Sequence, residues 1–183
     1  MNPAVIAHSL MTKATAPDRD VAVADTLLTT YRGSILPEWV DYNGHLRDAF
    51  YLLIFSYASD ALADHLGLDA AGRAATGHSI FTLECHLNYF HEVKQGAPVQ
   101  VRTQLLGHGN KRLHLYHRLH GADASTTLAS NEQLLTNVDM SGPRTAPFAG
   151  PVLARLQRLA QLHRELPVPP HVGRVIRLMP DQL

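Results

Sequence analysis

The sequence is poor in cysteine and contains no long apolar run. Its 183 residues include a single cysteine, Cys85, which excludes an intrachain disulfide and suits a reducing compartment. No apolar run approaches the roughly 20 residues that a membrane-spanning helix needs. The opening residues also lack the basic and apolar regions of a secretory signal. These absences predict a cytoplasmic protein that is not inserted in a membrane.

An excess of charge of either sign is also absent. Sixteen basic residues balance sixteen acidic ones, so no overall field attracts nucleic acid or an anionic membrane surface. An anionic ligand must therefore be held by a local group of basic side chains. The apolar fraction of 45% and the charged fraction of 17% are typical of a globular protein, and the length suffices for one domain with its own core.

The residue pattern divides the chain into three parts. Residues 1–22 show no periodicity and are interpreted as a mobile tail, residues 23–147 as the folded domain, and residues 148–183 as a C-terminal helix and tail. Within the domain, residues 26–33 are typical of a strand. Residues 48–66 have apolar side chains at helical spacing and, in the first half, nearly all round. Such a helix must be enclosed by other elements.

Alternating side chains predict further strands after a loop at residues 72–77. One face of the strand 80–89 would carry Phe81, Leu83, Cys85, Leu87 and Tyr89. Cys85 is therefore predicted to be buried, whereas Thr82, Glu84 and His86 would share the other face. The next strands cover residues 99–105, 113–119 and 126–138, the last with a bulge because its phase is ambiguous. The order predicts an α+β fold in which an antiparallel sheet wraps around one long helix, and its exposed edges predict pairing with a second copy.

The segment Asp41-Tyr42-Asn43-Gly44-His45 places a carboxylate and an imidazole beside a glycine turn, just before the long helix. A helix N-terminus presents unpaired backbone N–H groups and the positive end of a dipole. Chemistry that forms an oxyanion beside a carboxylate needs this combination. Alternatively, Asp41 caps the turn and has no chemical role.

The residues from Asp41 to Leu46, followed by a helix that carries Tyr51, resemble the hotdog-fold acyl-CoA thioesterases of the 4-hydroxybenzoyl-CoA thioesterase type. Their signature is an aspartate, two residues and then Gly-His at the start of a central helix. Residues 86–96 are similar to the strand and turn that follow this helix in the family. The resemblance covers residues 26–139 and implies a hotdog fold. It departs from the family at Arg47, where many relatives carry asparagine, so no role is assigned to that position.

A narrower resemblance links residues 38–45, the pattern Thr82-x-Glu84-x-His86-x-x-Tyr89 and residues 163–174 to the betainyl-CoA thioesterases of carnitine breakdown. It implies hydrolysis of a small polar acyl-CoA, with betainyl-CoA as the leading substrate, to a free acid and CoA without a cofactor. It also implies a homo-oligomer, dimeric or tetrameric, with active sites at the subunit interface. A hydratase or dehydratase and a non-catalytic acyl-CoA-binding module are the alternatives, because hotdog domains also serve these roles.

The resemblance implies catalytic roles for four residues. Asp41 would act as general base or as nucleophile, and the backbone N–H of Asp48 would hold the oxyanion. His45 would orient Asp41, bind the thioester carbonyl or shape the turn. Glu84 would be a second carboxylate, unless it lies on a solvated face. The expected substrate-binding residues are Trp39, Tyr42, Asn43 and Tyr89, with Trp39 alternatively in the core.

Lys111 and Arg112 follow a glycine-rich turn and, with Arg73, are the expected contacts for the phosphates of CoA. Alternatively, they are solvated cations at a hairpin tip. A spacing of three residues in a strand alternates His114, His117 and His120 between its faces. Because these histidines cannot converge on one ion, we expect no metal site.

Overall fold

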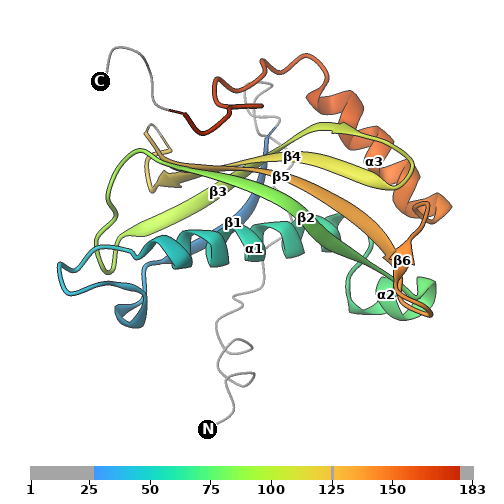
Figure 1. Ribbon diagram of the computed structural model, residues 1–183, viewed down its shortest axis with the longest axis horizontal. Helices are drawn as coiled ribbons and strands as arrows, with labels where there is room; N and C mark the ends of the chain where they lie inside the picture. The colour runs from blue at the N-terminus through green and yellow to red at the C-terminus, as the bar shows by residue number, and fades with distance from the viewer. Residues whose placement is uncertain (1–26, 125, 178–183) are drawn as a thin grey trace, which may run out of the picture.

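The computed structural model describes residues 27–124 and 126–177, so the expected tail at residues 1–22 lies outside the described residues. A single curved sheet carries the long helix on one face (Figure 1). The elements are β1 (Leu28–Ser34), the 3-10 helix η3 (Pro37–Trp39), α1 (Asp48–His65), α2 (Ala70–Thr76), β2 (His78–Tyr89), β3 (Pro98–His108), β4 (Arg112–Gly121), β5 (Thr127–Asp139), β6 (Arg144–Thr145) and α3 (Gly150–His163).

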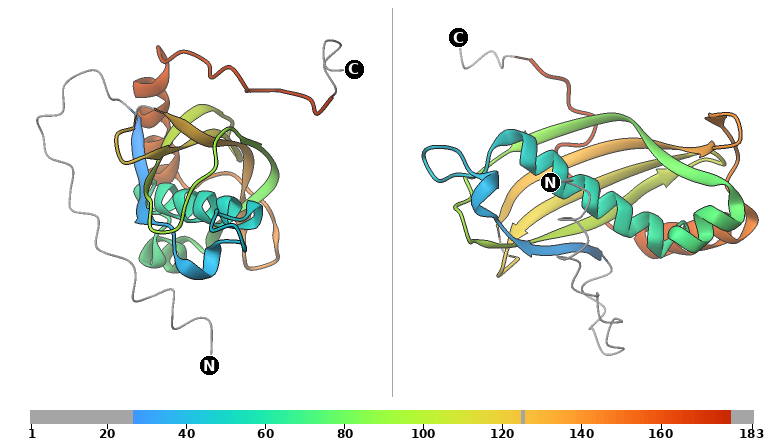
Figure 2. Two further views of the ribbon diagram at one scale, coloured as in Figure 1. Left: turned by 90° about the vertical axis from the view of Figure 1, so that its left-hand side faces the viewer. Right: turned by 90° about the horizontal axis from the view of Figure 1, so that it is seen from below.

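The sheet is antiparallel, with the strand order β1-β3-β4-β5-β2 and with β6 added to β5. In the two views of Figure 2 the strands arch over α1, which runs along the concave face. The predicted α+β arrangement, a sheet wrapped around one central helix, is confirmed. The predicted bulge in the last strand is also present, because the pairing of β4 with β5 shifts by one residue after Leu119.

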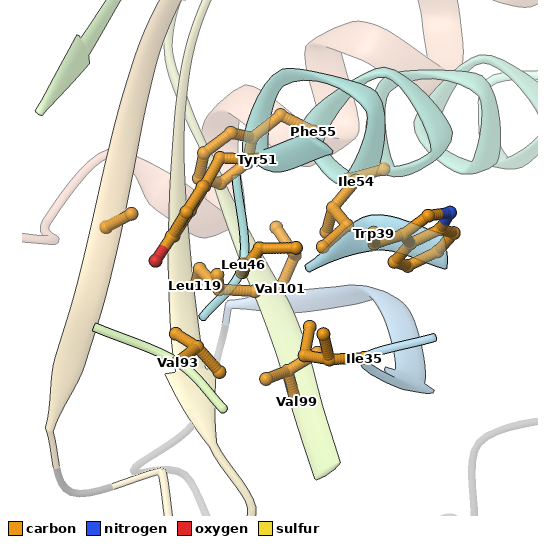
Figure 3. Packing of buried hydrophobic residues seen from close by; sticks show 12 residues of the cluster. Ile35, Trp39, Leu46, Tyr51, Ile54, Phe55, Val93, Val99, Val101 and Leu119 are labelled. Carbon is orange, nitrogen blue, oxygen red and sulfur yellow. The ribbon is translucent and has the colours of Figure 1, made fainter. Parts of the chain in front are cut away.

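Helix α1 is enclosed because its apolar side chains face the sheet at helical spacing. Tyr51, Ile54, Phe55, Ala58 and Leu62 are all buried. Figure 3 shows the first three packed against side chains from neighbouring strands and loops. Burying one large apolar side chain stabilises the fold by about 1.5–3 kcal/mol. The helix is followed by a glycine in the left-handed region, Gly67, with a φ of +87°.

A chain of polar side chains lies within this core. The imidazole of His117 on β4 is fully buried, with Nδ1 2.7 Å from Thr103 Oγ1 and Nε2 3.1 Å from Ser59 Oγ. The Ser59 hydroxyl donates to Gln133 Oε1 at 2.8 Å. Burial lowers the pKa of His117 to about 4. The neutral ring is therefore the form that the fold accommodates.

Strand β2 departs from the predicted alternation. Thr82 pairs with Leu135 and Glu84 with Leu134, so Leu83 forms a bulge. The bulge reverses the alternation of the strand, and the expectation that Thr82 and Glu84 share a face is wrong. The prediction that Cys85 is buried is also wrong. Its thiol is exposed, because β2 is the last strand of the described sheet.

The predicted loop at residues 72–77 is instead part of helix α2. The Asp69 side chain caps the helix by accepting the Gly72 N–H at 2.8 Å, and Gly77 ends it with a φ of +67°. Alanines favour the helix. Gly72 is needed because a Cβ there would collide with the Gly67 carbonyl. The two glycines thus serve close packing and termination rather than a loop.

The C-terminal helix predicted within residues 148–183 is α3, which covers part of a sheet edge. Strand β1 reaches only as far as Leu28, opposite Thr103 on β3. Beyond that point the Leu105 N–H donates to His163 Nδ1 at 2.9 Å. The chain after α3 then contacts the convex face, where the Gly173 N–H donates to Glu132 Oε2 at 2.7 Å. None of the helices in the described part of the chain is both long and apolar enough to span a bilayer.

Candidate active site

The loop before α1 is a narrow hairpin. Val40 and Leu46 pair across it, and the Asp41 N–H donates to the His45 carbonyl at 2.9 Å. Gly44 turns the chain at a φ of +77°, a conformation that glycine adopts without strain. The Leu46 N–H donates to the Val93 carbonyl at 2.8 Å. The hairpin is therefore held against the segment that follows β2.

The Asp41 carboxylate is both a cap and an available anion. Its Oδ1 accepts the backbone N–H groups of Asn43 at 2.8 Å and His45 at 3.1 Å. The His45 bond, the Asn43 bond and the nearby His45 and Arg47 side chains lower the pKa of Asp41. Among the described residues, no group donates to Oδ2. The turn therefore fixes an ionised carboxylate while leaving one oxygen available for chemistry.

The His45 side chain points to a partner that the sequence did not suggest. Its Nε2 lies 3.5 Å from Oε2 of Glu92, which follows β2. It is thus the backbone of His45, not the imidazole, that holds Asp41. Glu92 lies within the stretch that resembles the thioesterases, but no pattern around it marked it as a site residue.

The first turn of α1 leaves one backbone donor available. The Ala49 N–H donates to Asp48 Oδ1 at 2.8 Å, and the Phe50 N–H to the Arg47 carbonyl at 3.0 Å. The Asp48 N–H has no such partner among the described residues. It stands at the positive end of the helix dipole. This is the arrangement that an oxyanion requires.

An aromatic pair lies beside this turn. The rings of Tyr51 on α1 and Tyr89 on β2 meet edge to face, with centroids 5.2 Å apart. The Tyr51 hydroxyl donates to the His91 carbonyl at 3.4 Å, and Figure 3 shows it directed toward the side of Val93. Burial, Tyr89 and Glu92 raise the pKa of Tyr51 to about 12. Burial, Asp48 and Cys85 also raise the pKa of Tyr89.

Three of the expected substrate-binding residues differ in their surroundings. Trp39 is only 8% exposed and stacks on Phe50 with centroids 5.8 Å apart, so it lies in the core. Tyr42 is 95% exposed at the tip of the hairpin. Asn43, next to it, contributes its backbone N–H to Asp41.

The model of the thioesterase-like superfamily matches residues 35–173, which include the hairpin, α1 and the whole sheet after β1. The chain belongs to this superfamily. The matched residues include the helix N-terminus and the Asp41 turn.

Named relatives agree with the family. The chain is 64% identical over 154 residues to the betainyl-CoA thioesterase of Pseudomonas aeruginosa, covering 84% of this chain and 97% of the relative. It is 41% identical to the L-carnitine dehydrogenase/betainyl-CoA thioesterase of Agrobacterium fabrum, covering 84% of this chain but 31% of that longer protein.

Solved structures confirm the hotdog thioesterase fold. A candidate thioesterase from Pseudomonas putida superposes with a TM-score of 0.73 at 50% identity, covering 84% of this chain and 97% of that one. A Staphylococcus aureus protein in complex with CoA superposes with a TM-score of 0.78 at 25% identity, covering 84% and 96%.

The expected CoA-binding residues of this thioesterase lie far from Asp41 within one chain. Lys111 and Arg112 line a cavity of about 400 Å³ at the β3–β4 hairpin. This hairpin lies at the end of the molecule opposite the Asp41 loop (Figure 1), separated by the length of β3, about 33 Å. Arg73 on α2 donates to the Leu68 carbonyl at 2.6 Å and lies 3.7 Å from Asp64.

Glu84 and the histidines of β4 also lie away from the Asp41 turn. The bulge turns Glu84 to the convex face, so this carboxylate does not meet Asp41 in the same chain. His114 lies 2.7 Å from Glu132 on that face, whereas His117 lies under α1. The predicted alternation is confirmed. Within residues 27–124 and 126–177, no group of three or more His, Cys, Asp or Glu side chains is placed to hold a metal ion.

Proposed function

We propose that this thioesterase hydrolyses betainyl-CoA to betaine and free CoA. The 64% identity with a betainyl-CoA thioesterase, over nearly the whole of that relative, carries the choice of substrate. The unbonded Asp41 oxygen and the available Asp48 N–H support the reaction. Both groups belong to the hairpin and helix start that the family model covers.

In the proposed reaction the thioester carbonyl oxygen accepts the Asp48 N–H. As the tetrahedral intermediate forms, the negative charge on this oxygen is held by the N–H and by the helix dipole. A donor of this kind is typically worth about 2.7–4 kcal/mol in the transition state. Asp41 either removes a proton from the attacking water or attacks the carbonyl carbon itself. In both routes the carbon–sulfur bond breaks and CoA leaves as the thiolate. In the second route water then hydrolyses the mixed anhydride, which releases betaine and restores the Asp41 carboxylate.

A second copy of the chain would complete the site. Strand β2 ends the described sheet and exposes apolar side chains, with Leu83 at 51% and Phe81 at 44%, and Leu52 on α1 lies 41% exposed. Antiparallel pairing of β2 with β2 of a second copy would bury this edge and continue the sheet. Two-fold symmetry would also bring the cationic end of one copy, with its β3–β4 hairpin, toward the Asp41 end of the other. CoA phosphates could then be bound across the interface.

The variant Leu83→Lys is expected to separate the subunits, because it places a charge on the edge that would be paired. Light scattering after size exclusion should show the mass of one chain for this variant and twice that mass or more for the parent. Leu162→Lys on α3, where the leucine is 62% exposed, is the matched control and should keep the parent mass. An unchanged mass for Leu83→Lys would contradict pairing through β2.

Mass spectrometry of the products from betainyl-CoA distinguishes the candidate functions. We expect free betaine and CoA with a reactive thiol. A hotdog hydratase given an enoyl-CoA would instead add the mass of water and release no thiol. A binding module would raise the melting temperature by mass action and leave the ligand intact. Recovery of intact betainyl-CoA after prolonged incubation would overturn the proposed function.

A further inference from the structure

The position of the oxyanion donor limits where the acyl group lies. In betainyl-CoA a trimethylammonium group is attached to the carbon next to the thioester carbonyl. If the carbonyl oxygen lies on the Asp48 N–H, as in the proposed function, the cation is only two bonds from the carbonyl carbon. It must therefore lie beside the first turn of α1, which carries Asp48 and Tyr51.

The ring of Tyr89 lies near this place, beside Tyr51 and within the electrostatic influence of Asp48. Tyr89 is 52% exposed, so part of its ring remains open to a ligand. Tyr51 stands behind it edge to face, and the Tyr51 hydroxyl is held by the His91 carbonyl. The pKa values of both phenols are raised, so both rings are neutral at ordinary pH. A quaternary ammonium binds the faces of such rings.

Two carboxylates flank the aromatic pair. Asp48 lies one helical turn before Tyr51 and so on the same side of α1. Glu92 immediately follows His91, whose carbonyl the Tyr51 hydroxyl contacts. The nearby cation Arg47 directs its Nε to the Val40 carbonyl at 3.0 Å. The carboxylates thus add negative potential next to the rings.

A buried amide lies one step deeper on the concave face. Asn131 on β5 is fully buried, and neither its Nδ2 nor its Oδ1 has a partner among the described residues. It lies two residues from Ala129, which pairs with Tyr89, and hence about 7 Å farther along the sheet. A buried amide without partners is costly. A polar or charged group of a ligand placed beside this amide would offset that cost.

Building on the proposed function, we propose that Tyr89, backed by Tyr51 and flanked by Asp48 and Glu92, receives the quaternary ammonium of the substrate, with the Asn131 amide at the inner end. The receptor selects for positive charge in the acyl group, not only for its size.

Two thioesters of the same shape isolate this selection. In tert-butylacetyl-CoA a carbon replaces the quaternary nitrogen of betainyl-CoA, so the pair differs in charge alone. The measured quantity is the ratio of kcat/KM for betainyl-CoA to kcat/KM for the neutral analogue. Tyr89→Leu should lower the ratio about tenfold, and Glu92→Gln about threefold. Tyr89→Phe keeps the aromatic ring and should give the same ratio as the parent. Glu165→Gln, which changes an exposed glutamate beside Arg164, should also leave the ratio unchanged.

Asn131→Leu separates binding from stability. Leucine fills a similar volume without polar atoms, so the melting temperature should stay the same or rise. The ratio should nevertheless fall about threefold, because the amide no longer faces the cation.

A different set of results would overturn the receptor. Equal kcat/KM of the parent enzyme for the two thioesters would contradict a receptor for the quaternary ammonium. Variants in which kcat/KM falls in equal proportion for both substrates would contradict it too. The second outcome would assign Glu92 to orienting His45 and Tyr89 to packing. Failure of the parent to hydrolyse betainyl-CoA would instead contradict the proposed function, so the two failures are distinguishable. Glu92 is exposed, so its variant folds even if the Tyr89 variant does not.

Discussion

Replacing Asp41 with asparagine is expected to lower kcat for thioester hydrolysis at least about a hundredfold, the low end for loss of a general base. The amide oxygen can still accept the N–H groups of Asn43 and His45, so the hairpin keeps its cap. The amide nitrogen that replaces Oδ2 can neither take a proton nor attack a carbonyl. The loss should therefore appear in kcat, measured by thiol release, while the fold and the oligomer stay intact.

Asp139→Asn is the matched control for this variant. Asp139 also caps a turn, accepting the Ser141 N–H at 2.9 Å and the Ser141 hydroxyl at 2.7 Å, and these bonds lower its pKa as well. It lies at the end of β5, away from the Asp41 hairpin. The control should keep the activity of the parent. An Asp41→Asn enzyme with full activity would show that Asp41 is only a cap.

The second large effect is expected in stability at mild acid. His117 is neutral in the folded protein down to a pH of about 4, whereas an unfolded histidine takes a proton near pH ~6.5. Between these values the unfolded state binds more protons, so the free energy of unfolding falls as the pH falls. The contribution of His117 to this fall is about 2 kcal/mol between about pH 7 and about pH 5. This loss of stability is complete once the pH falls below the pKa of His117 in the folded protein.

The variant His117→Gln should remove this contribution. A glutamine oxygen can accept from Thr103 and its nitrogen can donate to Ser59, which replaces both contacts of the ring. Denaturant unfolding at the two pH values should show a fall that is about 2 kcal/mol smaller than in the parent. His91→Gln, which changes an exposed histidine, should show the same decrease in the free energy of unfolding as the parent. Equal falls in all three proteins would mean that His117 is protonated without unfolding.

Side-chain patterns within one element were enough to predict the main architecture. The apolar stripe of residues 48–66 predicted an enclosed helix, and α1 is Asp48–His65. The alternation in residues 99–105 and 113–119 predicted two strands, and these residues lie in β3 and β4. Val99, Val101, Thr103 and Leu105 on β3, and Leu113, Leu115, His117 and Leu119 on β4, are buried.

The bulge at Leu83 could not be predicted because the residue types continue to alternate across it. A bulge depends on how a strand is paired, and the pairing partner of β2 is β5, about 50 residues later in the chain. One extra residue was enough to move Glu84 to the convex face. The same lack of pairing information explains the error at Cys85, because its exposure depends on β2 being the last strand.

In the candidate site, too, contacts within one short motif could be predicted from the sequence, whereas contacts between distant segments could not. Asp41, His45 and the start of α1 lie within one short motif, so their proximity follows from the sequence. The contact of Tyr51 with His91 spans 40 residues, and that of His45 with Glu92 spans the same helix and strand. These contacts depend on how β2 returns past the first turn of α1. Glu92 was therefore missed, although it lies beside the predicted residues.

Hydrolysis of betainyl-CoA by this thioesterase is tested by comparing kcat/KM for thiol release from betainyl-CoA, a short aliphatic acyl-CoA and an aromatic acyl-CoA. A thioesterase with Asp41 beside the N-terminus of α1 and a receptor for a quaternary ammonium should give the highest kcat/KM with betainyl-CoA. A higher value with either of the other thioesters, or no thiol release from any of them, would contradict the proposed function.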